Sequence, residues 1–118
     1  MIEDYVSFEV AKLLKDKGFD ECPLFCYDDC GQLWVQGGYD KTKKWHFPAP
    51  TLQMAMKWLR EKYHIFICTL FLENEDAWGF TIEDTSAKKY LTTSRDTTYE
   101  SYEVAAEAAI KYCLEKLI

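Results

Sequence analysis

The sequence has no apolar run long enough to cross a membrane. Its longest nearly apolar stretch covers residues 65–72, whereas a transmembrane helix needs about 20 such residues. The first residues are acidic, so the basic and apolar regions of a secretory signal peptide are missing as well. We therefore expect a cytoplasmic protein that is neither secreted nor anchored in a membrane.

The sequence also lacks the motifs that mark common classes of enzyme. It contains no phosphate-binding glycine loop, no HExxH and no GxSxG. The paired acids at 28–29 and 75–76 lie in predicted turns, where aspartate is favoured for backbone reasons. We expect no catalytic residues, no cofactor and no enzymatic activity.

The cysteines are odd in number, namely Cys22, Cys26, Cys30, Cys68 and Cys113. All fall in or beside predicted strands or a helix, where a buried thiol packs like an apolar residue. A zinc site formed by the first three with His46 is an alternative, but their spacing of four differs from the CxxC of structural zinc sites. A nucleophile and base, formed by Cys26 or Cys68 with His46 or His64, is another, but a buried strand thiol is inert. We expect reduced, packed thiols and no metal.

The apolar content is sufficient for one hydrophobic core. Of the 118 residues, 48% are apolar and 16% are aromatic. A chain of this length buries most of its unfolded surface without disulfides or metals. We expect a single α+β domain over residues 1–118.

Three segments combine helical periodicity with capping residues. The predicted helices are 8–17 after Ser7, 52–63 after Thr51 and 102–117 after Ser101. Serine and threonine accept hydrogen bonds from the first helical turn, and Gly18 fits the left-handed position that ends the first helix. Glu107 and Lys111 have the spacing of a surface ion pair, and alanines on the inner side of the last helix allow close packing on a sheet.

Short apolar runs around turns predict two hairpins. The runs are 24–27 with 33–36, and 65–72 with 78–82, followed by a weaker strand at 89–93. Residues 65–72 are apolar on both alternating sides, which is typical of a central strand covered on each face. Residues 39–50 have no periodicity and predict a loop.

The order of elements predicts the fold class. Consecutive hairpins favour an antiparallel sheet, and amphipathic helices cover one of its faces. We predict a two-layer α+β fold with one antiparallel sheet of four to five strands and three helices, in the order α-β-β-α-β-β-(β)-α. Two apolar runs followed by a helix occur twice, over 24–63 and 65–117, which indicates at most a structural duplication.

The net charge of −6 is unevenly distributed. Residues 1–39 carry eight acids and three bases, residues 40–62 two acids and six bases, and residues 63–118 ten acids and five bases. The middle segment is a candidate site for single-stranded nucleic acid or another polyanion, because its cations can bind phosphate and its rings can stack on bases. The residues of this candidate site are Lys41, Lys43, Lys44, Trp45, His46, Lys57 and Arg60. Nucleic-acid-binding domains are usually basic throughout, so solvated lysines are the simpler interpretation. An acidic decoy of nucleic acid is weaker, because 14 bases accompany the 20 acids.

An uncovered sheet face is the second candidate site. If all three helices lie on one side of the sheet, the other side exposes an apolar patch that self-association would bury. The predicted self-association residues are Phe66, Phe71 and Trp78. Alternatively, the first helix crosses to that side and covers it.

Residues 5–19, 48–63 and 102–114 resemble a group of small uncharacterised proteins from phages and mobile elements of gut bacteria. The resemblance covers the three predicted helices and implies a phage or prophage setting, without an activity. We therefore predict a non-enzymatic accessory protein that acts by protein–protein contact, as a homodimer, with an unidentified protein partner and no membrane. Binding of single-stranded nucleic acid or another polyanion through residues 41–62 is the alternative.

Overall fold

The computed structural model describes residues 5–21, 23, 25–34, 43–44, 46–94 and 97–118. The elements are α1 (Phe8–Asp16), β1 (Cys26–Tyr27), β2 (Leu33–Trp34), β3 (Phe47–Pro48), α2 (Leu52–Tyr63), β4 (Ile65–Leu72), the 3-10 turn η1 (Glu73–Glu75), β5 (Ala77–Asp84), β6 (Lys89–Thr93), α3 (Tyr102–Tyr112) and the π-helical turn η2 (Cys113–Leu117). The α+β class and the antiparallel strand pairing are confirmed.

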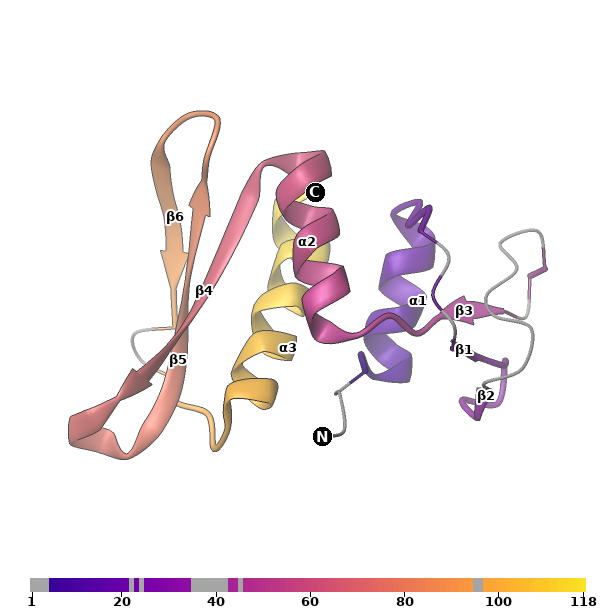
Figure 1. Cartoon of the computed structure of the whole chain (residues 1–118), viewed down its shortest axis with the longest axis horizontal. Coiled ribbons are helices and arrows are strands. Elements are labelled where there is room, and N and C mark those ends of the chain that lie inside the picture. The colour runs from indigo at the N-terminus through magenta and orange to yellow at the C-terminus, as the bar shows by residue number, and fades with distance from the viewer. Residues whose placement is uncertain (1–4, 22, 24, 35–42, 45, 95–96) are drawn as a thin grey trace.

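The elements form successive layers along the long axis of the molecule (Figure 1). The β4–β6 sheet lies at one end, α2 and α3 pack against it, α1 follows, and the small β1–β3 sheet lies at the other end. Both α2 and α3 contact β4, while α1 contacts α3 and β3. All three helices therefore lie between the two sheets.

The predicted single sheet of four to five strands is wrong. The strands form two separate three-stranded sheets with the orders β2-β1-β3 and β4-β5-β6. The unpredicted strand β3 lies in the segment expected to be a loop, where Phe47 pairs with Tyr27 and Pro48 with Cys26. Strand β1 is paired on both sides, by β2 and β3, and the second hairpin pairs with β6 instead. The different strand orders also show that the repeated pattern is a repeat of element order only.

The predicted helix starts are confirmed. The side chains of Ser7, Thr51 and Ser101 accept hydrogen bonds from backbone N–H groups three residues ahead, at 3.3, 3.1 and 3.1 Å. Gly18 adopts the expected left-handed conformation with φ +80°. The third helix differs from the prediction only at its end, where the α-helical pattern changes to a π-helical turn after Tyr112.

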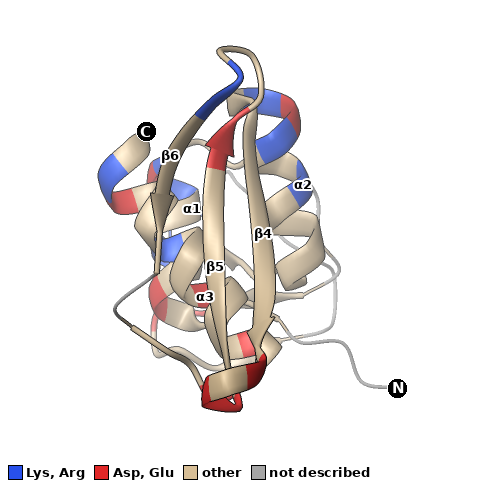
Figure 2. Cartoon of the chain, turned by 90° about the vertical axis from the view of Figure 1, so that its left-hand side faces the viewer, with Lys and Arg blue, Asp and Glu red and all other residues tan. Residues whose placement is uncertain are grey.

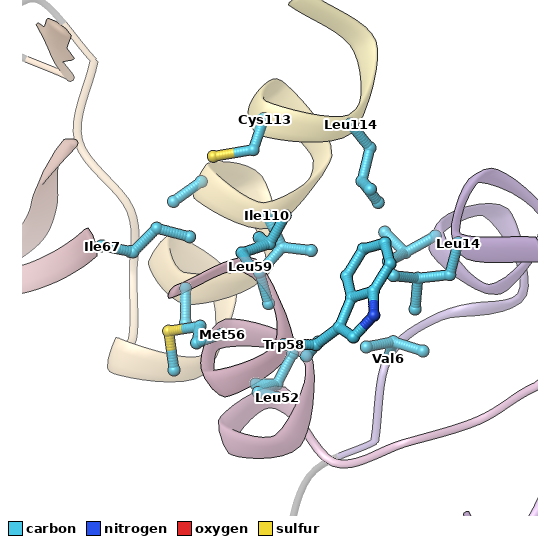
Figure 3. Packing of buried hydrophobic residues seen from close by; sticks show 14 of the residues in the cluster. Val6, Leu14, Leu52, Met56, Trp58, Leu59, Ile67, Ile110, Cys113 and Leu114 are labelled. Atoms are coloured by element: carbon cyan, nitrogen blue, oxygen red, sulfur yellow. The ribbon is translucent and has the colours of Figure 1, made fainter. Parts of the chain in front are cut away.

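The hydrophobic core is continuous from the larger sheet to α1 (Figure 3). Leu59 of α2 and Ile110 of α3 are both 0% exposed. They lie between Ile67 of the sheet and Leu14 of α1, which belong to the same buried cluster. The alanines of α3 that allow its close packing are also fully buried, namely Ala105, Ala106 and Ala109.

Polar contacts fasten α1 to the last helix. The Lys111 Nζ atom lies 2.7 Å from Glu9 Oε1, and the backbone N–H of Ser7 donates to Glu107 Oε1 at 2.5 Å. The four-residue spacing predicts an ion pair between Glu107 and Lys111 along α3. In the structure, the side chains of both residues instead contact the first helix and its cap.

We expect Leu59→Ala to lower the free energy of unfolding by about 2–5 kcal/mol, because it removes a fully buried side chain and leaves a cavity. The matched control is Val104→Ala on α3, where the side chain is 41% exposed and the expected change is within about 0.5 kcal/mol. Urea unfolding of both variants measures the difference. A cost for Leu59→Ala no larger than that of the control would contradict this description of the core.

Candidate protein-contact surface

One face of the β4–β6 sheet is not covered by any element in the described part of the chain. Figure 2 views this face directly, with the helices behind the sheet. Because side chains alternate along a strand, Ile67 and Ile82 point into the core and are 8% and 0% exposed. Phe66 and Leu70 point the other way and are 37% and 40% exposed.

Strand β6 adds two further apolar side chains to this face. Tyr90 and Leu91 are 53% and 36% exposed and lie at the bulge where the β5–β6 register shifts. We call this surface the bare face; its outward residues are Phe66, Cys68, Leu70, Leu72, Ala77, Gly79, Thr81, Glu83, Tyr90, Leu91 and Thr93. Among these residues, Glu83 is the only one with a formal charge.

The bare face requires a glycine on its middle strand, near the η1 turn. A Cβ atom on Gly79 would lie 2.8 Å from Ser94 Oγ and 3.3 Å from Leu72 Cδ1. The Leu72 and Ser94 side chains therefore lie close together across the middle strand. They also line a shallow hollow of about 270 Å³ together with Leu70 and Thr93.

The β6 side of this sheet is protected. Strand β6 is only five residues long and begins with Lys89. Beyond its end, Ser94 Oγ accepts a hydrogen bond from the backbone N–H of Phe80 at 2.8 Å. Tyr99 and Trp78 exchange two backbone hydrogen bonds, each 2.8 Å long. Short length, lysine and a bulge are devices by which proteins keep a sheet edge from pairing with another chain.

The β4 side has none of these devices. Strand β4 is eight residues long, contains no charge and no proline, and pairs with β5 without a bulge. The prediction that residues 65–72 form a central strand is therefore wrong. The side chains of β4 are apolar on both faces of the sheet. One of these faces is nevertheless uncovered, and one edge of the strand is unpaired.

The hydrogen-bond pattern identifies the outward groups of β4. The Thr85 N–H donates to the carbonyl oxygen of His64 at 2.8 Å. Because antiparallel pairing alternates, the even-numbered residues of β4 direct their backbone groups toward β5. The backbone groups of Ile65, Ile67, Thr69 and Phe71 point to the open edge. Among the described residues none has a backbone partner there.

Opposite charges flank the two ends of the β4 edge. At its start, α2 exposes the cations Lys57 and Arg60, with one acid, Glu61, beside them; at its end, the η1 turn exposes three acids, Glu73, Glu75 and Asp76. Figure 2 shows these two groups at opposite ends of the sheet. Lys62 lies on another side of α2, with its Nζ over the Trp58 and Tyr63 rings. Arg60 also lines a hollow of about 270 Å³ between α2 and β4, together with Gln53, Phe66 and Thr69.

The predicted self-association residues do not share one face. Phe66 belongs to the bare face, whereas Phe71 and Trp78 lie on the helix side, with ring centroids 5.2 Å apart. Trp78 also makes an edge contact with Tyr102 at the start of α3. Sequence reasoning missed Leu70, Tyr90 and Leu91. The two-residue alternation from Phe66 would have indicated Leu70.

The predicted basic site is divided in the structure. Lys41 and Trp45 lie outside the described residues. Lys43 and Lys44 are exposed in the segment before β3, where the Lys43 carbonyl oxygen accepts a hydrogen bond from Lys15 of α1 at 2.5 Å. The other described members, His46, Lys57 and Arg60, are also separated: His46 precedes β3 and the other two lie on α2. Polyanion binding stays a prediction, and this placement does not favour it.

The thiol nearest to a histidine is buried. Cys26 Sγ lies 4.0 Å from His46 Nδ1, which is the pairing that a nucleophile would need. Cys26 is only 3% exposed, and burial, followed by the nearby charge of Asp28, raises the pKa of its thiol. The thiol is therefore held protonated and out of reach of a substrate. Cys22 lies outside the described residues.

A turn in the small sheet gathers potential metal ligands. Asp28, Asp29 and Cys30 are the only such group in the described part of the chain, with ligand atoms within 4.8 Å of one another. Asp28 already accepts hydrogen bonds from the backbone of Cys30 and Gln32 and from the Trp34 indole. These hydrogen bonds lower the pKa of Asp28, and the bond from Trp34 has the largest effect. The Asp28 carboxylate therefore already serves to stabilise the turn.

Comparison with known proteins gives no match to a family model, a curated protein or a solved structure. Within the described residues, no helix combines the length and apolar character needed to cross a membrane.

We expect Asp29→Asn to speed the alkylation of Cys30 at pH 8. The charge of Asp29 is the largest cause of the raised pKa of this exposed thiol, so its removal increases the thiolate fraction. Cys113, whose pKa burial raises to about 12, should not react while the protein is folded. Timed iodoacetamide pulses with peptide mass spectrometry measure both rates. Asp29→Glu keeps the charge and should keep the slow rate; equal rates in all three proteins would contradict the electrostatic cause.

Proposed function

We propose that this protein is non-enzymatic, acts by protein–protein contact in a phage or prophage setting, and binds a partner protein through the bare face. The observation that carries the proposal is the group formed by Phe66, Leu70, Tyr90 and Leu91, which are 36–53% exposed on one uncovered face. Moving such side chains out of water is favourable by about 25 cal/mol per Å².

The chemistry of the face specifies the kind of partner. Protein interfaces are depleted of charge at their centres and enriched in aromatic residues, and the bare face has one aromatic side chain at each lateral side, Phe66 on β4 and Tyr90 on β6. Its single formal charge, Glu83, lies between them in the register. A partner with an apolar contact surface fits this arrangement better than a charged ligand does.

Site-specific crosslinking tests the proposed function. With the photoreactive residue benzoylphenylalanine in place of Leu70, irradiation in the producing cell should give a discrete adduct with another protein. The matched control carries the same residue in place of Val104, which is equally apolar and 41% exposed but lies on α3. We expect an adduct at Leu70 that is at least several-fold stronger than at Val104. The reason is that only the former lies on the bare face.

Specificity of the adduct is checked by a second change on the same face. Tyr90→Lys should suppress the adduct at Leu70, because it places a charge in the contact without touching the core. Adducts of equal strength at the two positions, or an adduct unaffected by Tyr90→Lys, would contradict the proposed function. The absence of any adduct with a second protein would also contradict it, whether or not copies of this chain crosslink to each other.

A further inference from the structure

We propose that two copies of this chain join through their β4 edges, antiparallel about a two-fold axis, to form one continuous sheet in the order β6-β5-β4-β4-β5-β6. The contact is made by the backbone of the β4 edge, and Phe66 and Leu70 of the bare face border it. A Leu70 adduct between two copies of this chain therefore belongs to this dimer, whereas an adduct with another protein belongs to the proposed function.

The two edges of the larger sheet differ. Strand β6 is short, begins with Lys89 and joins β5 through a bulge, and beyond its end Ser94 and Tyr99 bond to the backbone of β5. The β4 side presents eight uncharged residues with outward backbone groups at every second position. Long, unguarded, apolar edges pair readily with another strand. A second copy presents the same edge, so self-pairing about a two-fold axis satisfies both.

The geometry of the open edge also imposes a register on the two β4 strands. Only the odd-numbered residues of β4 point their N–H and C=O groups outward, so hydrogen-bonded pairs must join odd residues to odd residues. Pairing Ile65 with Phe71 and Ile67 with Thr69 of the second copy uses all of these groups. On the bare face, the same register sets Phe66 opposite Leu70 of the second copy. Apolar cross-strand pairs of this kind stabilise a sheet.

Opposite charges lie at the two ends of the β4 edge. In the antiparallel arrangement, the start of one β4 lies beside the end of the other. The exposed α2 cations Lys57 and Arg60, which have one acid, Glu61, beside them, then approach the three acids of the η1 turn, which are Glu73, Glu75 and Asp76. The two-fold axis repeats this match at both ends, whereas a parallel arrangement would bring like charges together.

The path of β4 leaves space for the second strand. Figure 1 shows that β4 runs away from α2 as it approaches η1, so the helix overhangs only the first part of the edge. At that part, the hollow of about 270 Å³ between α2 and β4 is lined by Gln53, Arg60 and Thr69. In the proposed register this hollow faces the small Thr69 side chain of the second copy.

A charge-swap experiment tests the inference on the purified full chain. One variant carries Glu73→Lys and Glu75→Lys, and the other carries Lys57→Glu and Arg60→Glu; all four positions are exposed. Sedimentation equilibrium should give twice the chain mass of 13.9 kDa for the parent and the single-chain mass for each variant alone. Mixing the two variants in equal amounts should restore the two-chain mass, because the opposite charges then meet again.

The matched control separates local charge from net charge. Glu21→Lys with Glu115→Lys makes the same change in net charge as the Glu73→Lys, Glu75→Lys variant, at exposed positions on the α1 side of the molecule, and this control variant should keep the two-chain mass. Thr69→Pro, which removes one outward N–H without touching the β4–β5 bonds, should give the single-chain mass. Thr69→Val keeps that N–H and should remain dimeric.

Several outcomes would overturn the inference. They are a parent with the single-chain mass at every concentration, variants that stay dimeric alone, or a mixture that stays monomeric. A dimer that survives Thr69→Pro would assign the contact to stacked bare faces instead. If the unmodified protein is monomeric but still forms the Leu70 adduct with another protein, the dimer is ruled out and the proposed function remains. If the protein is dimeric but forms no adduct with another protein, the proposed function is ruled out and the dimer remains.

Discussion

Burial of α2 and α3 from both sides is the constraint on which the rest of the structure depends. Leu59 and Ile110 have no exposed surface, because the larger sheet covers one side of the helical pair and α1 covers the other. A chain with three helices that places all of them between two sheets has none left for the outer face of β4–β6. The bare face is therefore a product of a well-filled interior and not of loose packing.

The same arrangement changes the meaning of the charge pattern. In the sequence, a basic middle segment lies between two acidic ones and resembles a single cationic strip. In the fold, β3 takes one part of that segment to the small sheet, and α2 takes Lys57 and Arg60 to the edge of the large sheet. The acidic residues Glu73 and Glu75 then lie at the far end of the same strand. The uneven charge along the sequence thus places basic residues near the start of β4 and acidic residues near its end.

Local features were predictable from the sequence and long-range pairing was not. The caps at Ser7, Thr51 and Ser101 and the bounds of α2 and β4 follow from contacts within a few residues, which a sequence pattern records directly. Strand β3 is only Phe47–Pro48, too short for any periodicity, yet its pairing with β1 decides that there are two sheets. The bare face was foreseen as a possibility. The residues that form it were not predicted correctly. To place Phe71 and Trp78 on the helix side, one must know which part of the sheet α3 contacts.

The polar contacts between α1 and α3 have a consequence for how the chain acquires its structure. Ser7 and Glu9 bind Glu107 and Lys111, about a hundred residues later in the sequence. Such distant contacts must wait until the later segment has left the ribosome, and they slow the search for the native state. While α3 is still being synthesised, the first helix can pack on β3 of the small sheet but not yet on α3. During that interval the side of α1 that later packs on α3 is available to chaperones.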